Sequence, residues 1–445
     1  MPKTIMGIQG LNPWNILMLF VAAGWFVSRQ KEGTTLPIPA GIRILLIIYV
    51  SFVFISAFRL LGSYDEFVRW GQVTMGDVDS KMSLISEHII NSVKWLVPGF
   101  LLYKGCNSRE RLYWAIGAVL MVYVLLAVQV IRWMPLSNLT GGDALSERAL
   151  KILSNEIGFH RVNLSMLLSG GSWAIFCTRI WFQSKKMFLV VCFASVMLLF
   201  AVALTGGRTG YVTWAFVGMM IASVKWKKYI FLAPIPVLVM YMLVPSAFDR
   251  LFQGTDENET IQMSEALRED LAMTQTDMVL YSVTSGRNIA WPFVMEKVGE
   301  RPWLGYGRQA MVTTGVTAYL WTSYSESFPH PHNLYLEFLM ENGILGLFPV
   351  LLLFLIVLRR SYALFKDKHN VDYQVVGGIC FALILAFMFA GIGSQTFYPR
   401  EGAVGMWCAM ALVLRFWQLR EKAVQEEEKV APTTAADSSK FAWET

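Results

Sequence analysis

Long apolar runs, separated by short polar segments, recur from one end of the chain to the other. Each run is close to 20 residues, the length of helix that crosses about 30 Å of hydrocarbon. A backbone in hydrocarbon has no water to bond, so such a span must be a helix. We expect spans at roughly 11–27, 42–58, 89–103, 112–131, 163–182, 187–204, 209–224, 229–245, 335–357, 374–394 and 402–418. The pattern predicts an all-α polytopic membrane protein with eleven spans, or twelve if residues 1–10 are the stub of another.

The polar segments divide the chain into four regions. Residues 1–245 and 334–418 hold the predicted spans, and residues 246–333 form one insert that is too long for a plain connection and too polar to cross a membrane. Apolar residues at helical spacing within 262–280 predict a helix lying on the bilayer surface. Residues 419–445, where three consecutive glutamates precede a run of small and polar residues, predict a solvated, disordered tail.

The positive charge of the chain is concentrated in every second loop. The formal net charge is +6, although only 16% of the residues are charged. These loops hold Arg29, Lys31 and Arg43; Lys104, Arg109 and Arg111; Lys185 and Lys186; Lys225, Lys227 and Lys228; Arg359, Arg360, Lys366 and Lys368; and Arg415, Arg420 and Lys422. Loops rich in Lys and Arg face the cytoplasm, so the charge is a topology signal and not a nucleic-acid footprint. The outward segments are then 59–88, 132–162, 205–209, 246–333 and 395–401.

Three outward segments carry charge at the membrane surface. They are TGGRTG at 205–210, TSGRNIAW at 284–291 and HPHNLYLE at 330–337, the last of which enters a span. An arginine at the bilayer centre costs ~2.5–3.5 kcal/mol, and less near the interface, so it usually has an anionic partner. For Arg208 alone, reaching the phosphates of lipid headgroups explains its position equally well.

Two arginines and a histidine on one face provide a specific chemistry. Guanidinium groups donate paired hydrogen bonds to phosphate, so Arg208 and Arg287 suit a diphosphate and the charge that builds on it as a leaving group. The imidazole of His332 can accept the proton of a hydroxyl nucleophile. Together they form a minimal set for glycosyl transfer from a lipid diphosphate without a metal ion.

Two of these segments resemble motifs of the O-antigen ligase superfamily. HNLYL at 332–336, followed by ENGILG at 341–346, resembles the histidine motif of the family. TGGR at 205–208 resembles the arginine turn that the family places between two spans. Gly207 stands where the family commonly has a serine, but the arginine itself is in place.

The insert carries a further part of the same resemblance. SGR at 285–287 with Trp291, then RPWLGYG at 301–307, resembles the periplasmic-loop motif of the family, and Asn163 matches an asparagine often found at the start of a span. The motifs stand in the family's order and cover roughly residues 158–418.

The resemblance implies a GT-C-like helical glycosyltransferase of the bacterial inner membrane, with short helices in one large periplasmic loop and a site facing the periplasm. Such enzymes take a glycan from undecaprenyl diphosphate to an acceptor hydroxyl, with inversion and without a metal or other cofactor. It implies that Arg208 and Arg287 grip the diphosphate and that His332 activates the acceptor. Further substrate-binding residues are expected at Arg161, His330 and Asn333. For Arg161 with His160, an ordinary interfacial pair is the plainer interpretation.

Several functions remain open at this stage. An O-antigen ligase, with the lipid A–core as acceptor, is preferred over a Wzy-type polymerase, whose acceptor is another lipid-linked repeat. A transporter or flippase of lipid-linked sugars is the alternative of another class, and Gly170 with Gly171 is a candidate helix break for it. In the first outward loop, Asp77 and Asp79 form a D-x-D pair that is able to hold Mg²⁺, although such pairs are common in solvated loops.

Overall fold

The computed structural model describes most of the chain, and the described residues are almost entirely helical. They are residues 4–5, 8–9, 13–29, 37–106, 108–134, 149–232, 234–247, 281, 284, 286–393 and 396–440. A small antiparallel hairpin at the start pairs β1 (Thr4–Ile5) with β2 (Ile8–Gln9). The remaining described elements are helices, so the predicted all-α polytopic membrane fold is confirmed.

Six helical segments in the described part of the chain are long and apolar enough to cross a membrane. They are α2 (Ala40–Gly62), α7 (Arg109–Trp133), α10 (Lys185–Leu204), α19 (Leu334–Phe365), α20 (Val371–Ala390) and the segment Glu401–Gln425, which combines η6 (Glu401–Ala403) with the start of α21 (Val404–Lys440). Each of the six lies on a predicted span.

The other predicted spans fall on shorter helices. These are α1 (Pro13–Arg29), α6 (Val97–Gly105), α9 (Arg161–Cys177), α11 (Arg208–Lys225) and α12 (Pro234–Leu243). The span expected at 89–103 is divided among η1 (Ser86–Asn91), α5 (Ser92–Lys94) and α6. Pro98 is the second residue of α6, and Pro234 is the first residue of α12. Proline has no amide hydrogen and disfavours a helical residue before it, so it is tolerated at the start of a helix and ends the helix that precedes it. Among the described residues, the number of single helices long enough to cross a membrane is therefore smaller than the eleven or twelve spans predicted.

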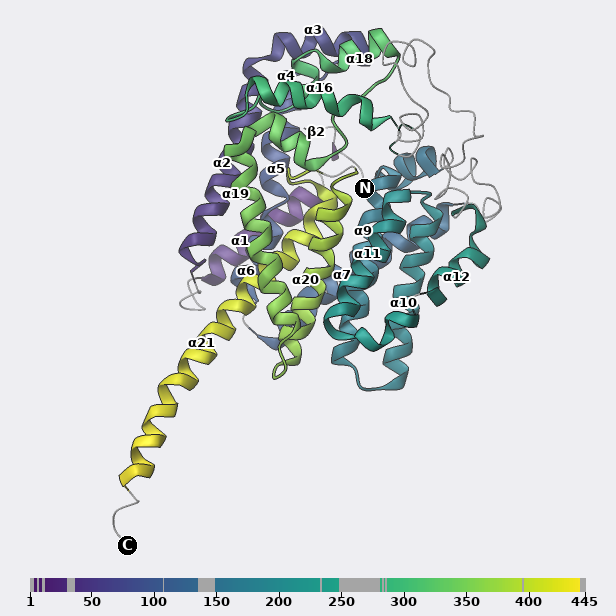
Figure 1. Ribbon diagram of the computed structural model, residues 1–445. Coiled ribbons are helices and arrows are strands. Elements are labelled where there is room, and N and C mark those ends of the chain that lie inside the picture. The colour runs from purple at the N-terminus through teal and green to yellow at the C-terminus, as the bar shows by residue number, and fades with distance from the viewer. Residues whose placement is uncertain are drawn as a thin grey trace.

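Short helices of the insert and of the first long loop gather at one end of the bundle (Figure 1). They are α3 (Tyr64–Met75), α4 (Lys81–Ile85), α16 (Arg287–Glu300), α17 (Ala310–Thr313) and α18 (Val316–Tyr324). α17 and α18 pack on α3, and α16 packs on α19. The expected short helices in the large loop are thus present, whereas the expected surface helix at 262–280 lies outside the described residues.

The centre of the bundle is α20, which packs against α9, α19, α11 and α21. Its apolar segment is 83% buried inside the protein, whereas that of α2 is only 28% buried. α9 runs unbroken through Gly170 and Gly171, so the suspected helix break does not occur there. A Cβ on Gly170 would lie 2.9 Å from that of Ala386, and one on Gly171 would lie 2.7 Å from the Tyr123 ring. These glycines let neighbouring helices approach closely.

The loops predicted to share the cytoplasmic side contact one another at the opposite end of the bundle. Asp372 forms an ion pair with Arg109 at 2.8 Å and accepts a hydrogen bond from Trp181 Nε1 at 2.9 Å. Lys225 Nζ donates to the Phe365 carbonyl at 3.3 Å. Beyond these loops α21 continues away from the bundle as a helix to Lys440, in the segment for which a disordered tail is predicted (Figure 1).

Candidate active site

Four helices begin close together at the end of the bundle that carries the insert, and three of them begin with an arginine. α9 starts at Arg161, α11 at Arg208 and α16 at Arg287, while α19 starts directly after Asn333. The first amides of a helix have no partner within it, so each start carries partial positive charge. The arginines add full charges, and the combination suits an anion.

Direct contacts join the starts of α9 and α11. Arg161 Nη1 donates to the Gly206 carbonyl at 3.3 Å, and Ser169 Oγ donates to the Gly210 carbonyl at 2.8 Å. A Cβ on Gly207 would lie 2.5 Å from Ser165 Oγ. The packing of these two helices therefore accounts for glycine at the position where the related motif commonly has serine.

The start of α19 is joined to α11 through the turn after α20. The Leu334 amide donates to the Gly391 carbonyl at 2.8 Å, and two residues later a Cβ on Gly393 would lie 3.0 Å from the Thr209 side chain. α16 is joined to the same place, because Trp291 Nε1 donates to the Pro331 carbonyl at 3.0 Å. The three sequence segments singled out for their chemistry thus meet in space.

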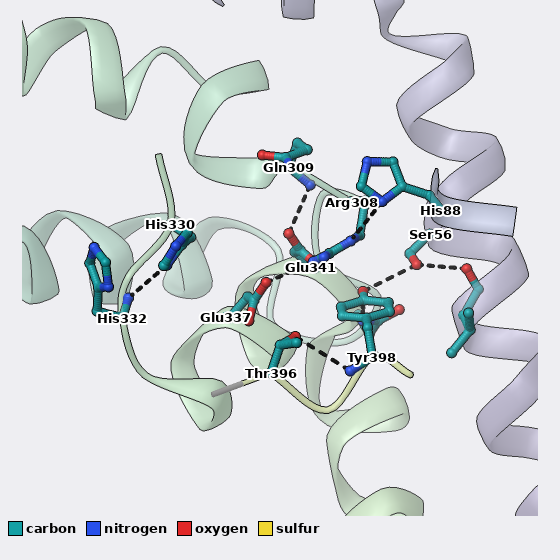
Figure 2. Close-up of polar contacts among 12 residues, drawn as sticks. Ser56, His88, Arg308, Gln309, His330, His332, Glu337, Glu341, Thr396 and Tyr398 are labelled. Atoms are coloured by element: carbon teal, nitrogen blue, oxygen red, sulfur yellow. Dashed lines mark hydrogen bonds and ion pairs between the residues drawn. The ribbon is translucent and has the colours of Figure 1, made fainter. Parts of the chain in front are cut away.

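The histidine segment is held in a defined conformation ahead of α19. His332 has a left-handed backbone (φ 52°), and its amide donates to His330 Nδ1 at 3.3 Å (Figure 2). The two imidazole rings lie 4.1 Å apart between centroids. Asn333 caps α19, its Oδ1 accepting from the amides of Tyr335 at 3.0 Å and Leu336 at 3.2 Å. Asn333 therefore has a structural role that the sequence analysis did not assign.

His332 is surrounded by positive and neutral groups. Burial first, and then His330, Arg287 and His160 in that order, lower the pKa of His332 to about 2. These electrostatic effects require proximity, so they place Arg287 and both neighbouring histidines around His332. Its Nδ1 atom is buried and has no hydrogen-bond partner among the described residues. The imidazole is therefore neutral at pH 7.

Arg287 is a cation that no carboxylate of the described residues neutralises by an ion pair. Burial lowers its pKa, but an arginine remains charged over the whole physiological range. The neighbouring His160 also has a pKa lowered by burial, then by Arg161 and by Arg287. Of the predicted site residues, the structure brings together Arg161, Arg287, His330, His332 and Asn333, with Arg208 at the adjoining start of α11.

A second arginine of the insert, Arg308, forms a buried cluster that the sequence analysis missed. Its Nη1 atom donates to Glu337 Oε1 at 2.7 Å and to Glu341 Oε2 at 2.9 Å (Figure 2). Its Nε atom donates to His88 Nδ1 at 3.4 Å, and the guanidinium lies 3.8 Å from the centroid of the Tyr398 ring. The signal was available, because two carboxylates one helical turn apart at the start of an apolar span require a cation.

Carboxylates compensate the charge of Arg308 in this second cluster. Arg308 is 7% exposed, and burial by itself lowers its pKa, but Glu341 and Glu337 raise the pKa more, so the net shift is upward. Burial, Arg308 and Arg400 together lower the pKa of His88 to about 3. His88 is therefore a neutral acceptor for the Arg308 guanidinium, and the cluster ties the insert to α19.

The insert is also fastened to α19 at a break in that helix. α19 leaves the helical conformation at Gly343 (φ 65°, ψ −172°). Residues 301–307, which we call the strap, supply the backbone partners that the break removes. Before the break, the amides of Tyr306 and Gly307 donate to the carbonyls of Met340 (2.9 Å) and Glu341 (2.8 Å). After the break, the amides of Ile344 and Leu345 donate to the strap carbonyls of Pro302 (2.8 Å) and Trp303 (3.2 Å). The RPWLGYG and ENGILG motifs are thus structural partners.

In the acidic pair of the first loop, Asp79 forms a hydrogen bond within its own loop. Asp79 Oδ1 accepts a hydrogen bond from Ser83 Oγ at 2.9 Å, beside the Ser80 cap of α4. Within the described residues, no group of three or more His, Cys, Asp or Glu side chains is placed to hold a metal ion.

Comparison with known proteins identifies the segment that contains this site. No curated protein matches the chain. Residues 193–351 match the family model Wzy_C, described as O-antigen ligase. The match spans Arg208, Arg287, Arg308 and His332, from α10 into the first half of α19. Part of the chain, from α10 into α19, is therefore similar to an O-antigen ligase domain, which supports the resemblance to the O-antigen ligase and Wzy-type superfamily.

Proposed function

We propose that this chain transfers a glycan from undecaprenyl diphosphate to a sugar hydroxyl of the lipid A–core, at the periplasmic face of the inner membrane. One observation carries the proposal. Four helix starts bearing Arg161, Arg208, Arg287 and His332 converge at one end of the bundle, and no described carboxylate forms an ion pair with Arg287. Such a concentration of arginines and helix N-termini at a membrane surface suits the diphosphate of a lipid carrier.

The diphosphate would bind between the helix starts and the arginines. Guanidinium forks and first-turn amides donate to its oxygens, and they stabilise the extra charge that develops as the bond to the sugar breaks. Arg287 and Arg208 are assigned to this role, with Arg161 beside the turn that precedes Arg208. This chemistry needs no metal ion, and activity of the purified protein in EDTA tests that part of the proposal.

His332 would accept the proton of the attacking hydroxyl. The acceptor oxygen forms a bond to the anomeric carbon, the carbon–oxygen bond to the diphosphate breaks with inversion, and the diphosphate leaves with the electron pair. In the free protein His332 is a weak base, because its pKa is lowered to about 2. The negative charge of a bound diphosphate opposes the effect of Arg287, so donor binding raises the basicity of His332.

A polysaccharide polymerase is the second candidate, because the matched family is compatible with either acceptor. Transport is less well supported, because the arginines of the candidate site lie at one end of the bundle and α9 is continuous through its glycine pair. The ligase and the polymerase differ in the product that accumulates when transfer stops.

The test uses single substitutions in the native host. Arg287→Ala should lower glycan transfer by about 100- to 1000-fold, as loss of a charge-stabilising donor does. Arg287→Lys, which keeps the charge without the planar fork, should be intermediate. Lys297→Ala removes a positive charge from the same helix and serves as the control. Lipopolysaccharide and lipid-linked glycans are resolved on gels at matched protein levels.

The accumulated intermediate decides between the candidates. Full-length glycan left on the lipid carrier supports a ligase, and single repeats left on the carrier support a polymerase. Wild-type lipopolysaccharide in Arg287→Ala, His332→Ala and Arg208→Ala alike would show that the catalytic assignment is wrong.

A further inference from the structure

Two large apolar side chains are exposed at the tip of the strap. Trp303 is 63% exposed and Leu304 is 53% exposed, although both belong to the insert that the charge pattern places in the periplasm. A soluble surface rarely presents adjacent residues of this size without a partner. Their position relative to the spans indicates what that partner is.

The strap lies beside the last turns of α2, on the membrane side of the end of that helix. Arg59 Nη1 and Nη2 donate to the carbonyls of Leu304 at 2.5 Å and Gly305 at 2.6 Å. The Arg308 amide donates to the Ser56 carbonyl at 3.0 Å. At 1.5 Å per residue, Arg59 and Ser56 are about 5 and 9 Å below the end of α2 at Gly62. The strap is therefore level with the last two turns of α2, within the depth of the adjacent leaflet.

The exposed pair continues a lipid-facing stripe of α19. Leu345, whose amide donates to the Trp303 carbonyl, is itself exposed, and Phe348 one turn further along is 64% exposed. Leu352 and Leu355 extend the same stripe down the helix. Residues 344–365 alone are about 33 Å long, enough to cross the hydrocarbon, so this stripe faces lipid. Trp303 and Leu304 lie at its upper end.

Most of the hydrogen-bonding groups in the backbone of the strap are satisfied by the protein. Five consecutive carbonyls, from Arg301 to Gly305, each accept a hydrogen bond from the protein. Four consecutive amides, from Gly305 to Arg308, each donate one. A loop in water can leave such groups to solvent, whereas irregular backbone at membrane depth is tolerated only when the protein satisfies it.

We propose that the strap is a membrane anchor, in which Trp303 and Leu304 insert into the outer leaflet beside α2 and α19. Tryptophan favours the headgroup layer, and leucine favours the acyl chains just below it. The anchor follows directly on Glu300, the last residue of α16, while Arg287 begins that helix about 20 Å away. Lipid contact at one end of α16 therefore fixes the height of its other end above the membrane.

The experiment measures the immersion depth of nitroxide labels on the full-length protein in nanodiscs of phosphatidylethanolamine and phosphatidylglycerol. Single labels are placed at Trp303→Cys, at Leu304→Cys and, as the matched control, at the exposed Ser323→Cys in α18, which lies at the end of the molecule away from the spans (Figure 1). Unsubstituted protein gives the background from its five native cysteines, four of which are buried. Collision rates with oxygen and with a water-soluble nickel chelate give the depth of each label.

An anchor gives labels at 303 and 304 that collide preferentially with oxygen, and a label at 323 that collides preferentially with nickel. Leu304→Cys retains Trp303, so it tests the anchor even if the other variant fails to fold. Labels at 303 and 304 that collide with nickel as often as the label at 323 would overturn the proposal. Spin–spin broadening at 304 would also overturn it, because a second copy of the chain would then cover the surface.

Discussion

Two arginine–histidine pairs flank the first turns of α19, and they differ in charge balance. Arg308 with His88 is accompanied by Glu337 and Glu341, whereas no described carboxylate forms an ion pair with the Arg287 that lies near His332. Burial first, and an arginine second or third, lower the pKa of each histidine, to about 3 for His88 and to about 2 for His332. The two pairs thus differ in the acids beside them, and the pair without described acids is also the more exposed of the two.

The difference separates a structural cluster from a binding site. A buried ion pair that satisfies its own charge has no need of a ligand and holds the segments that supply it. Arg287, which forms no ion pair with a carboxylate of the described residues, is only half-buried, and a cation in that position attracts an anion. Charge balance, more than residue type, indicates which of the two pairs acts on substrate.

The largest expected effect comes from substituting the two histidines. His332→Ala should lower transfer by about 100- to 10,000-fold, because it removes the proposed proton acceptor. His88→Ala removes a neutral acceptor from the structural cluster and should leave the rate per folded molecule within a few-fold of wild type. Both are assayed at matched amounts of folded protein. Equal losses in the two variants would remove the distinction between the pairs.

The second effect is on stability, where substitutions in the Arg308 pair should have larger effects than substitutions in the Arg287 pair. Arg308→Ala leaves two buried carboxylates without a cation and should lower the free energy of unfolding by about 3–5 kcal/mol. Arg287→Met, which strands no described ion-pair partner, should leave the thermal unfolding midpoint unchanged. The triple variant Arg308→Met, Glu337→Gln, Glu341→Gln should recover much of the loss, since no isolated charge remains. A triple variant as unstable as Arg308→Ala would show that charge balance is not the cause.

A smaller effect is expected where the strap meets α19. Gly343→Ala places a Cβ 2.2 Å from the Trp303 carbonyl group at a left-handed φ, so the strap must move and Arg308 with it. The strain should cost about 1–3 kcal/mol. Gly299→Ala, in α16 with no heavy atom within 4 Å of its Cβ, is the control and should be neutral or stabilising by up to roughly 1 kcal/mol. Equal thermal midpoints for the two variants would contradict the tight fit.

The smallest expected effect is in the pH dependence of stability. Both histidine pKa values lie below the 6.5 of a free imidazole, so the unfolded chain binds protons that the folded chain does not. Their stabilisation is complete above about pH 6.5 and is lost on acidification, by at most about 1.4 kcal/mol per pH unit for each histidine.

Inorganic pyrophosphate should reduce the acid sensitivity only through His332. The change in thermal midpoint between pH 7 and pH 5 should shrink with pyrophosphate in wild type and in His88→Gln, but not in His332→Gln. If His332→Gln responds as His88→Gln does, the bound anion does not interact with His332.

The sequence predicted the six long apolar helices and the proximity of two of the singled-out segments, for physical reasons. Hydrocarbon imposes helices of fixed length, so apolar runs such as that of α20 predict them directly. Alternating basic loops predicted which ends would meet, and the segments of Arg287 and His332 do meet. The break before Pro98, within the span expected at 89–103, was not predicted.

The cluster around Arg308 and the break at Gly343 could not be derived from sequence alone. Both depend on residues 301–308 lying against α19, a contact between segments that no local pattern specifies. Glu337 and Glu341 indicated that a cation lies beside them, but the sequence offered several arginines and did not identify Arg308 as the partner. The structural function of Gly207 likewise depends on Ser165 in another helix.

The division of α19 at Gly343 has a consequence for biogenesis. The strap that satisfies this break precedes α19 in the chain, and Arg59, 245 residues before Leu304, holds the strap in place. All three segments must therefore pack together before the backbone hydrogen bonds at the break are complete. Membrane insertion of the span and completion of its hydrogen bonds are separate events.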